Sequence, residues 1–366
     1  CYAGQIGGSM AVIKAFECIR PDEKVADRVA ALPYDVYNRE EALKEVEREP
    51  LSFLAIDRAE TQFDSSVDTY ADCVYDKARE LLDSRIADGT FITDTDKAYY
   101  VYELTMNGRT QTGIAACASI DDYNNNIIKK HENTRADKEQ DRINHVDRCS
   151  AQTGPIFLAY RADEVIRNEV AKARETKPLY SFTSPDGIRH QVYKISNAQS
   201  VENIEKAFAG IDDIYIADGH HRAASAVKVG LKRREEHPDY TGEEEFNYFL
   251  SVLFPDEELM IMPYNRVVKD LNGYSKEEFI KKIEEKFEIE ESAAAVEPAY
   301  KAEFGMYLDE KWYKLKAKKD ILSDVPVDGL DVAILQNNLL EPVLGIHDPK
   351  TDKRIDCWRN KRTFGA

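Results

Sequence analysis

The chain has 366 residues, enough for two modest domains, and 43% of them are hydrophobic, which supports substantial cores. Its formal charge of −18 disfavours adhesion to DNA or anionic lipid, because repulsion from phosphate would dominate. No stretch approaches the roughly 18 uninterrupted apolar residues of a membrane span, and the six scattered cysteines form no disulfide framework or zinc motif, so we expect a cytoplasmic protein with reduced thiols.

The chain begins with a short segment, residues 1–9, that precedes a plausible start at Met10. This segment is rich in glycine and serine and lacks the basic start and long apolar core of a signal peptide. We interpret it as a tag remnant or upstream translated sequence, so the native protein is expected to begin at residue 10.

The next part of the chain is predicted to be mostly helical. Asn38 and Glu41 have the spacing of a capping box, which predicts a helix that ends near Pro50. The apolar residues 51–56 then predict a strand. In residues 67–82 apolar side chains recur at helical spacing, which predicts a second helix.

Turn signals predict two β-hairpins in the middle of the chain. Asn107-Gly108 is the strongest short hairpin signal and lies between the β-rich runs 97–106 and 109–120. Asp186-Gly187 marks the second hairpin. Between the two, the pattern predicts a strand and then a helix at residues 155–160 and 163–176.

An apolar strand at residues 211–217 is predicted to run directly into the sequence Asp218-Gly219-His220-His221-Arg222, and a helix of small residues is predicted from residue 223. Gly219 permits a sharp turn, and a helix that follows offers unpaired N–H groups at the positive end of its dipole. His220, His221 and Arg222 add donors, and Arg222 can grip a phosphate in a bidentate way.

Asp218 stands where a carboxylate could hold Mg²⁺ or accept a proton from a hydroxyl. The alternative for the whole loop is an ordinary turn whose histidines only cap or pack. Two adjacent histidines out of seven at a strand-to-helix turn favour the first interpretation, a phosphate-binding loop.

A charged stretch at residues 129–142 is the second candidate site. It could be a solvated helix stabilised by i,i+4 pairs such as Arg135 with Glu139. Its basic groups and carboxylates, with Asn133 and Thr134 between them, also suit the phosphates of a nucleotide and a bound Mg²⁺. Spacing alone leaves both interpretations open.

Residues 232–245 form a charged linker, which predicts a boundary between a nucleotide-binding domain at residues 10–231 and an α+β C-terminal domain at residues 246–356. In the second domain we expect paired strands around Pro255-Asp256, at residues 246–254 and 259–268. A capping box predicts a helix at residues 275–287, and a hairpin near Asp309-Glu310 and a helix at residues 331–340 follow.

The charged stretch at residues 129–142 and the loop at residues 218–222 each contain a short motif, or box, that resembles one of a known superfamily. Glu132-Asn133-Thr134-Arg135-Ala136-Asp137 resembles the E-N-x-x-R-x-D box of the ParB/sulfiredoxin-like superfamily. Asp218-Gly219-His220-His221-Arg222 resembles the later phosphate-binding box of that superfamily and the D-G-H-H-R box of archaeal free serine kinases. Residues 31–355 are similar to domain-of-unknown-function family 1015, with further matching pieces at residues 32–36, 52–54, 130–132 and 151–155.

The resemblance implies a mixed α/β fold, with a ParB/sulfiredoxin-like nucleotide-binding core, insertions and the additional α+β region. It implies that Glu132 and Asn133 lie near Mg²⁺, and that phosphates contact Arg135, Gly219, His220, His221 and Arg222. Lys130 and His131, in the same charged stretch, are further expected phosphate contacts. The chain has no counterpart of ParB's helix-turn-helix, and a histidine replaces sulfiredoxin's catalytic cysteine. Neither DNA partition nor sulfinic-acid repair is therefore expected.

The C-terminal residues depart from the family. Relatives continue past Ile355-Asp356 with Phe-Val-Gly-Gly-Ile-Arg-Gly, whereas this chain continues with Cys357-Trp358-Arg359. One codon string that encodes this tail gives Val-Gly-Gly-Ile-Arg-Gly-Leu when it is translated one nucleotide later. We infer that residues 357–366 are a frameshifted tail.

These observations predict a phosphotransferase that uses Mg²⁺ and a nucleotide, ATP or ADP with CTP as an alternative, to phosphorylate a small-molecule hydroxyl. Free serine is the first acceptor to test. Asp218, His220 and His221 form the expected catalytic set, with Asp218 as the base and Glu17 or Asp35 as alternatives for that role.

The competing interpretation is a nucleotide-binding switch or scaffold that hydrolyses slowly and acts through partners. A DNA-binding partition protein ranks last because of the charge. No membrane partner is expected, and the oligomeric state is left open.

Overall fold

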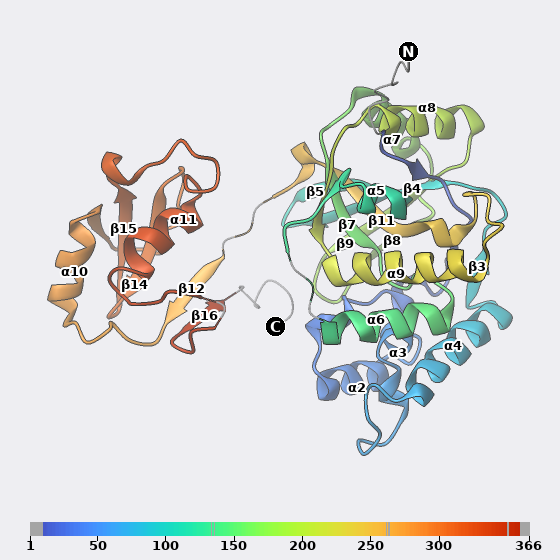
Figure 1. Ribbon diagram of the computed structural model, residues 1–366, viewed down its shortest axis with the longest axis horizontal. Helices are drawn as coiled ribbons and strands as arrows, with labels where there is room; N and C mark the ends of the chain where they lie inside the picture. Colours follow the sequence, from blue (N-terminus) through green and yellow to red (C-terminus); the bar gives the residue numbers. More distant parts are fainter. Residues whose placement is uncertain are drawn as a thin grey trace, which may run out of the picture. The chain divides into compact units, whose positions relative to one another are not determined.

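A computed structural model describes residues 10–132, 134, 136–260, 262, 264–349 and 351–358, except the side chains of Asp137, Cys357 and Trp358. The predicted extension at residues 1–9 and most of the predicted frameshifted tail lie outside the described residues. The chain divides into two compact units, Cys1–Met260 and Ile261–Ala366 (Figure 1). Within the described residues, no helix combines the length and the apolarity needed to cross a membrane.

The first unit is built on a nine-stranded sheet in the order β6-β10-β7-β11-β5-β4-β9-β8, with β1 paired to β5. The pairs β6–β10 and β7–β11 are parallel and the others are antiparallel, so the predicted mixed α/β class is confirmed. The strands are β1 (Ile13–Lys14), β4 (Tyr99–Met106), β5 (Arg109–Ser119), β6 (Ile128–Lys129), β7 (Ile156–Tyr160), β8 (Tyr180–Thr183), β9 (Arg189–Ile195), β10 (Ile214–Asp218) and β11 (Tyr248–Pro255). A separate pair joins β2 (Ile19–Pro21) to β3 (Phe91–Thr93).

Helices cover the sheet at two ends of the unit. In Figure 1, α7 and α8 lie on one side of the strands, and α9 and α6 run side by side between the strands and α2, α3 and α4 on the other. The helices are α1 (Ala26–Val29), α2 (Arg39–Arg48), α3 (Leu54–Asp57), α4 (Asp72–Ala87), α5 (Ile120–Asn124), α6 (Ala136–Cys149), α7 (Glu164–Arg174), α8 (Ala198–Ala209) and α9 (His220–Glu236). Short helical turns occur at η1 (Tyr34–Val36), η2 (Ala59–Gln62), η3 (Glu245–Asn247) and η4 (Asp256–Glu258).

The main core forms where apolar strand residues meet the inner faces of α7, α8 and α9. Ile156, Leu158 and Phe249 from the sheet are fully buried with Phe208 of α8 and Ala223 of α9. Burial on this scale contributes about 1.5–3 kcal/mol for each large apolar side chain. The core therefore fixes the place where β10 ends and α9 begins.

Local turn and cap signals are confirmed. Asn107 and Gly108 both have positive φ, 52° and 80°, and join β4 to β5 as the hairpin signal predicts. Gly187, at φ 82°, lies in the second hairpin, between β8 and β9. Asn38 caps α2 in a reciprocal capping box with Glu41, with both bonds at 2.9 Å.

Two strand predictions are wrong. Residues 51–56 include the start of helix α3 instead, where the Leu54 N–H donates to Ser52 Oγ at 3.3 Å. The expected pairing around Pro255-Asp256 does not form, since β11 pairs with β5 and β7 inside the central sheet.

The domain boundary also differs from the predicted linker. Helix α9 extends to Glu236, and β11 belongs to the central sheet, so the first unit continues through Met260. The charged stretch at residues 232–245 therefore lies within this unit, between a helix and a strand that both belong to its core.

The second unit has its own α+β core. A three-stranded antiparallel sheet, β13-β15-β14, packs with α10 and with a helix that continues as a π-helix, η6. The elements are β12 (Asn265–Val268), α10 (Lys276–Glu284), β13 (Phe287–Ser292), β14 (Glu303–Leu308), β15 (Lys311–Ala317), η5 (Lys319–Ile321), α11 (Asp331–Leu335), η6 (Gln336–Leu340) and β16 (Ile355–Trp358), which pairs with β12. The capping box of Ser275 with Glu278 and the hairpin at Asp309-Glu310 are confirmed.

Candidate functional site

The turn from β10 into α9 forms an open helix N-terminus. Gly219 adopts a left-handed conformation, φ 95° and ψ 33°, and α9 begins at His220, three residues earlier than predicted. The first intrahelical bond runs from the Ala223 N–H to the Gly219 carbonyl at 2.9 Å, and no side chain caps the helix. The N–H groups of His220 and Arg222 consequently have no acceptor within the helix and lie at the positive end of its dipole.

Arg222 is held beside this turn by internal contacts. Its Nη2 donates to Asp218 Oδ2 at 2.7 Å and its Nη1 donates to the Pro155 carbonyl at 2.5 Å. Its side chain is only 15% exposed, whereas that of Asp218 is 68% exposed. Asp218, the predicted base, thus serves in this structure as the carboxylate that orients Arg222.

Both glycines around Arg222 leave space for its side chain. A Cβ on Gly219 would lie 3.2 Å from the guanidinium, and one on Gly154 would lie 3.4 Å from Arg222 Cδ. Such a Cβ at Gly219 would also require a φ that L-residues rarely adopt. The position of the guanidinium therefore depends on the absence of a side chain at Gly219, whereas a Cβ at Gly154 would make an ordinary van der Waals contact.

His220 connects the two charged boxes. Its ring is buried, and its Nε2 accepts a hydrogen bond from the backbone N–H of His131 at 3.4 Å. A backbone N–H can only donate, so the ring proton belongs on Nδ1, which lies 3.6 Å from Glu132 Oε2. Burial, and then the neighbouring His131, lower the pKa of His220, so a neutral ring that links the boxes fits this environment.

The other predicted residues of the first box have different positions. Lys130 Nζ lies 4.0 Å from the centre of the Tyr123 ring and donates to the Tyr123 carbonyl at 3.2 Å. Asn133 and Arg135 lie outside the described residues. His221 is half-buried in the first turn of α9, where its carbonyl accepts a bond from Ser225 Oγ at 2.7 Å.

Helix α6 is not a solvated charged helix. Glu139, Arg142 and His145 are 6%, 7% and 3% exposed, and all three project toward the interior of the unit. Glu139 forms an ion pair with Lys228 of α9. The charges of this stretch therefore help to build the interior around the site.

A cavity of about 540 Å³ adjoins the turn and is lined by Asp218 and Arg222. Strands β4, β8 and β9 contribute aromatic and apolar side chains to it, although they lie far from β10 in the strand order. Several segments matched by the family resemblance also line it: Leu32, Pro33, Tyr34, Phe53, Gln152, Thr153, Gly154 and Pro155.

A polar wall of the cavity consists of Tyr34, Asp57, Arg142 and His145. The Arg142 guanidinium lies over the Tyr34 ring, 4.1 Å from its centre, and its Nε donates to Asp141 Oδ2 at 3.0 Å. Burial raises the pKa of Tyr34, and both Arg142 and Arg222 oppose this rise. The Tyr34 phenol therefore lies close enough to both Arg142 and Arg222 for their positive charges to act on it.

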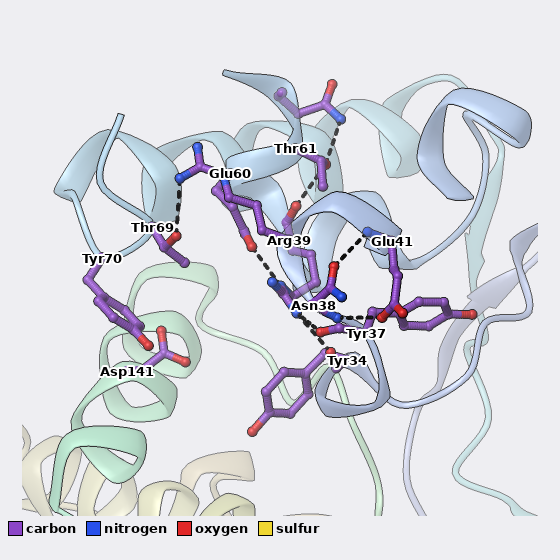
Figure 2. Close-up of polar contacts among 12 residues, drawn as sticks. Tyr34, Tyr37, Asn38, Arg39, Glu41, Glu60, Thr61, Thr69, Tyr70 and Asp141 are labelled. Atoms are coloured by element: carbon purple, nitrogen blue, oxygen red, sulfur yellow. Dashed lines mark hydrogen bonds and ion pairs between the residues drawn. The ribbon is translucent and has the colours of Figure 1, made fainter. Parts of the chain in front are cut away.

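The backbone of Tyr34 is held by a neighbouring arginine. Arg58 Nη1 donates to the carbonyls of Tyr34 and Tyr37, at 3.1 Å and 2.6 Å, while its Nε donates to Glu60 at 2.6 Å. Figure 2 shows the Tyr34 ring pointing away from the capping contacts of Asn38 and Glu41. This arrangement fixes the direction in which the phenol projects.

The sequence analysis did not identify Asp57, Arg142 or His145 as site residues. Asp57 directly follows a segment interpreted as a strand, and Arg142 lay at the end of a stretch that also suited a solvated helix. A usable signal was the spacing of Arg142 and His145, because residues three apart share one face of a helix.

The predicted Mg²⁺ ligands are only partly described. Across the described part of the chain, no three His, Cys, Asp or Glu side chains gather closely enough to hold a metal ion. Magnesium bound with a nucleotide needs only one or two protein carboxylates, because phosphates and water complete its shell. Glu132, with 59% of its side chain exposed beside His220, fits that smaller requirement.

Comparison with known proteins identifies the family and no characterised relative. No curated protein and no solved structure matches the chain. Residues 13–333 match the model of the family described as "protein of unknown function (DUF1015)", which covers both boxes, the cavity and most of the second unit. The chain therefore belongs to this family.

Proposed function

We propose that the protein is a cytoplasmic, nucleotide- and Mg²⁺-dependent phosphotransferase that phosphorylates the hydroxyl of a small molecule. The observation that carries this proposal is the open N-terminus of α9, with Arg222 oriented beside it, at the edge of a 540 Å³ cavity. Helix N-termini bind phosphate through unpaired N–H groups, and a cavity of this size is typical of small-ligand sites. The resemblance to the ParB/sulfiredoxin-like core adds support.

In this proposal the N–H groups of His220 and Arg222 and the Arg222 guanidinium bind the nucleotide phosphates. Mg²⁺ enters with ATP, ADP or CTP, and Glu132 is the described carboxylate that could contact it. The acceptor hydroxyl forms a new O–P bond while the bond to the leaving nucleotide breaks, and a carboxylate takes the hydroxyl proton. Asp218 is the first candidate for that carboxylate, and the resemblance to free serine kinases makes serine the first acceptor.

One observation favours the alternative, a nucleotide-binding switch or scaffold. Asp218 is already engaged in an ion pair with Arg222, so its role in the structure is explained without any proton transfer. A switch needs the phosphate contacts but no base, so the same turn would serve it equally well.

Calorimetry with Mg²⁺ and ATP, ADP or CTP tests the first step, binding of the nucleotide. Mass spectrometry of a panel of hydroxyl metabolites, serine included, then tests transfer. Arg167→Ala is a suitable control variant, because Arg167 forms an exposed ion pair with Glu257 and does not line the cavity. Failure of every nucleotide to bind would end the proposal, and hydrolysis indifferent to every metabolite would favour the switch.

A further inference from the structure

The cavity lining also contains a largely buried carboxylate. Asp57, at the end of α3, has a side chain that is 13% exposed, and its buried Oδ1 has no hydrogen-bond partner among the described residues. An ionised carboxylate can accept about four hydrogen bonds, and leaving a buried acceptor unsatisfied is unfavourable. A ligand that donates to the exposed part of this carboxylate would add a favourable contact at the cavity.

The neighbours of Asp57 indicate the charge of such a ligand. Arg142 is hydrogen-bonded to Asp141 and also attracts Asp57 electrostatically, so one guanidinium serves two carboxylates. His145 Nε2 lies 3.5 Å from Asp57 Oδ1, too far for a strong hydrogen bond, and it also faces the Cys149 thiol at 3.9 Å. Among the described neighbours the carboxylates thus outnumber the guanidinium, and a protonated amine supplies both a positive charge and donors.

We propose that Asp57 and His145 form the acceptor subsite, and that Asp57 binds a protonated amine of the acceptor. The inference rests on the proposed function, because the acceptor's hydroxyl must reach a phosphate held at Arg222. Asp57 and Arg222 line the same cavity. The acceptor class is then an amino alcohol, with or without a carboxylate.

The competing explanation is that Asp57 and His145 only connect α3 to α6 through an electrostatic contact. That role requires no ligand and shows no preference among small molecules. The two explanations therefore differ in binding measurements as well as in stability.

The test uses matched ligand pairs in which a hydroxyl replaces the amine: serine with glycerate, and ethanolamine with ethylene glycol. Binding to the full chain is measured by calorimetry, with and without nucleotide. We expect the amine of at least one pair to bind about tenfold or more tightly than its hydroxyl partner, and Asp57→Asn to remove that preference. Asp309→Asn, in an exposed ion pair with Lys276 in the second unit, is the matched control and should keep it.

Equal binding within every pair, or a preference that survives Asp57→Asn, overturns the subsite. The comparison on the unmodified protein decides the matter even if Asp57→Asn does not fold. The proposed function fails separately: an amine preference that depends on Asp57, without any nucleotide binding, would keep the subsite and reject the phosphotransferase. Phosphate transfer to hydroxyl compounds without an amine preference would keep the phosphotransferase and reject the subsite.

Discussion

The ring of His220 accepts a hydrogen bond from the backbone N–H of His131, 89 residues earlier in the chain. This contact joins the start of α9 to the loop before α6. The other ring nitrogen of His220 faces Glu132. The two charged boxes, distant in sequence, therefore meet through one buried imidazole. The contribution of the His220–His131 hydrogen bond to the stability of the first unit can be measured without any assay of enzymatic activity.

The first prediction concerns stability. His220→Ala should lower the free energy of unfolding of the first unit by about 1–3 kcal/mol, because the His131 N–H loses its acceptor and a buried ring is removed. Urea unfolding followed by a probe in the first unit measures this change. His347→Ala is the control, since its side chain is 80% exposed in the second unit, and an equal loss there would contradict the assignment.

The same ring predicts a pH dependence. Because the pKa of His220 is lowered in the folded protein, protons bind the unfolded state more readily. Its contribution to stability is complete above the ordinary histidine pKa of about 6.5 and declines as the pH falls from there toward the lower folded pKa. His220→Gln should flatten this decline between pH 7 and 5, and an unchanged slope would refute the neutral buried ring.

Gly219→Ala is expected to damage the phosphate site by two routes. It forces a φ of 95° on an L-residue, which costs about 1–3 kcal/mol, and it brings a Cβ within 3.2 Å of the Arg222 guanidinium. Gly187→Ala is a close control, since Gly187 has φ 82° and no atom within 4 Å of an added Cβ. Both variants should lose stability, but only Gly219→Ala should weaken nucleotide binding in calorimetry.

Arg222→Ala should weaken nucleotide binding roughly 30-fold or more, since loss of a charge-assisted contact to phosphate costs about 2–5 kcal/mol. Arg222→Lys keeps the charge but loses the planar fork that contacts both Asp218 and the Pro155 carbonyl, so an intermediate affinity is expected. If a folded Arg222→Ala variant binds nucleotide with unchanged affinity, the turn has no role in phosphate binding.

The sequence predicted the features that depend on neighbouring residues. The Asn107-Gly108 turn, the Asn38 cap and the glycine before α9 each satisfy a local backbone requirement that a few residues specify. The short apolar run at residues 51–56 suits either a strand or a buried helix, and tertiary packing selected α3. Packing overrode the local pattern there.

The remaining features depend on contacts between distant segments. Strand β11 pairs with β5 and β7, whose positions beside it no local pattern encodes. Asp57 and His145 come together only because α3 and α6 pack at one cavity. The ion pair of Asp218 with Arg222, by contrast, joins residues only four apart, in a motif whose residues were all identified but whose Asp218 had been assigned to catalysis.

The last prediction separates the phosphotransferase from the switch. Both need the phosphate contacts, so Arg222→Ala impairs either and does not discriminate. Only a phosphotransferase needs a proton acceptor within reach of the hydroxyl. Asp218→Asn keeps the size of the side chain and an oxygen that can accept the bond from Arg222 Nη2, but it removes the negative charge. If Asp218 is the base, nucleotide still binds and transfer falls about 100-fold or more, the usual scale for a general base.

Mass spectrometry of the acceptor and calorimetry of the nucleotide give the two quantities independently. Transfer that continues at the original rate in Asp218→Asn would assign Asp218 to the positioning of Arg222 alone, as its ion pair in the structure already suggests.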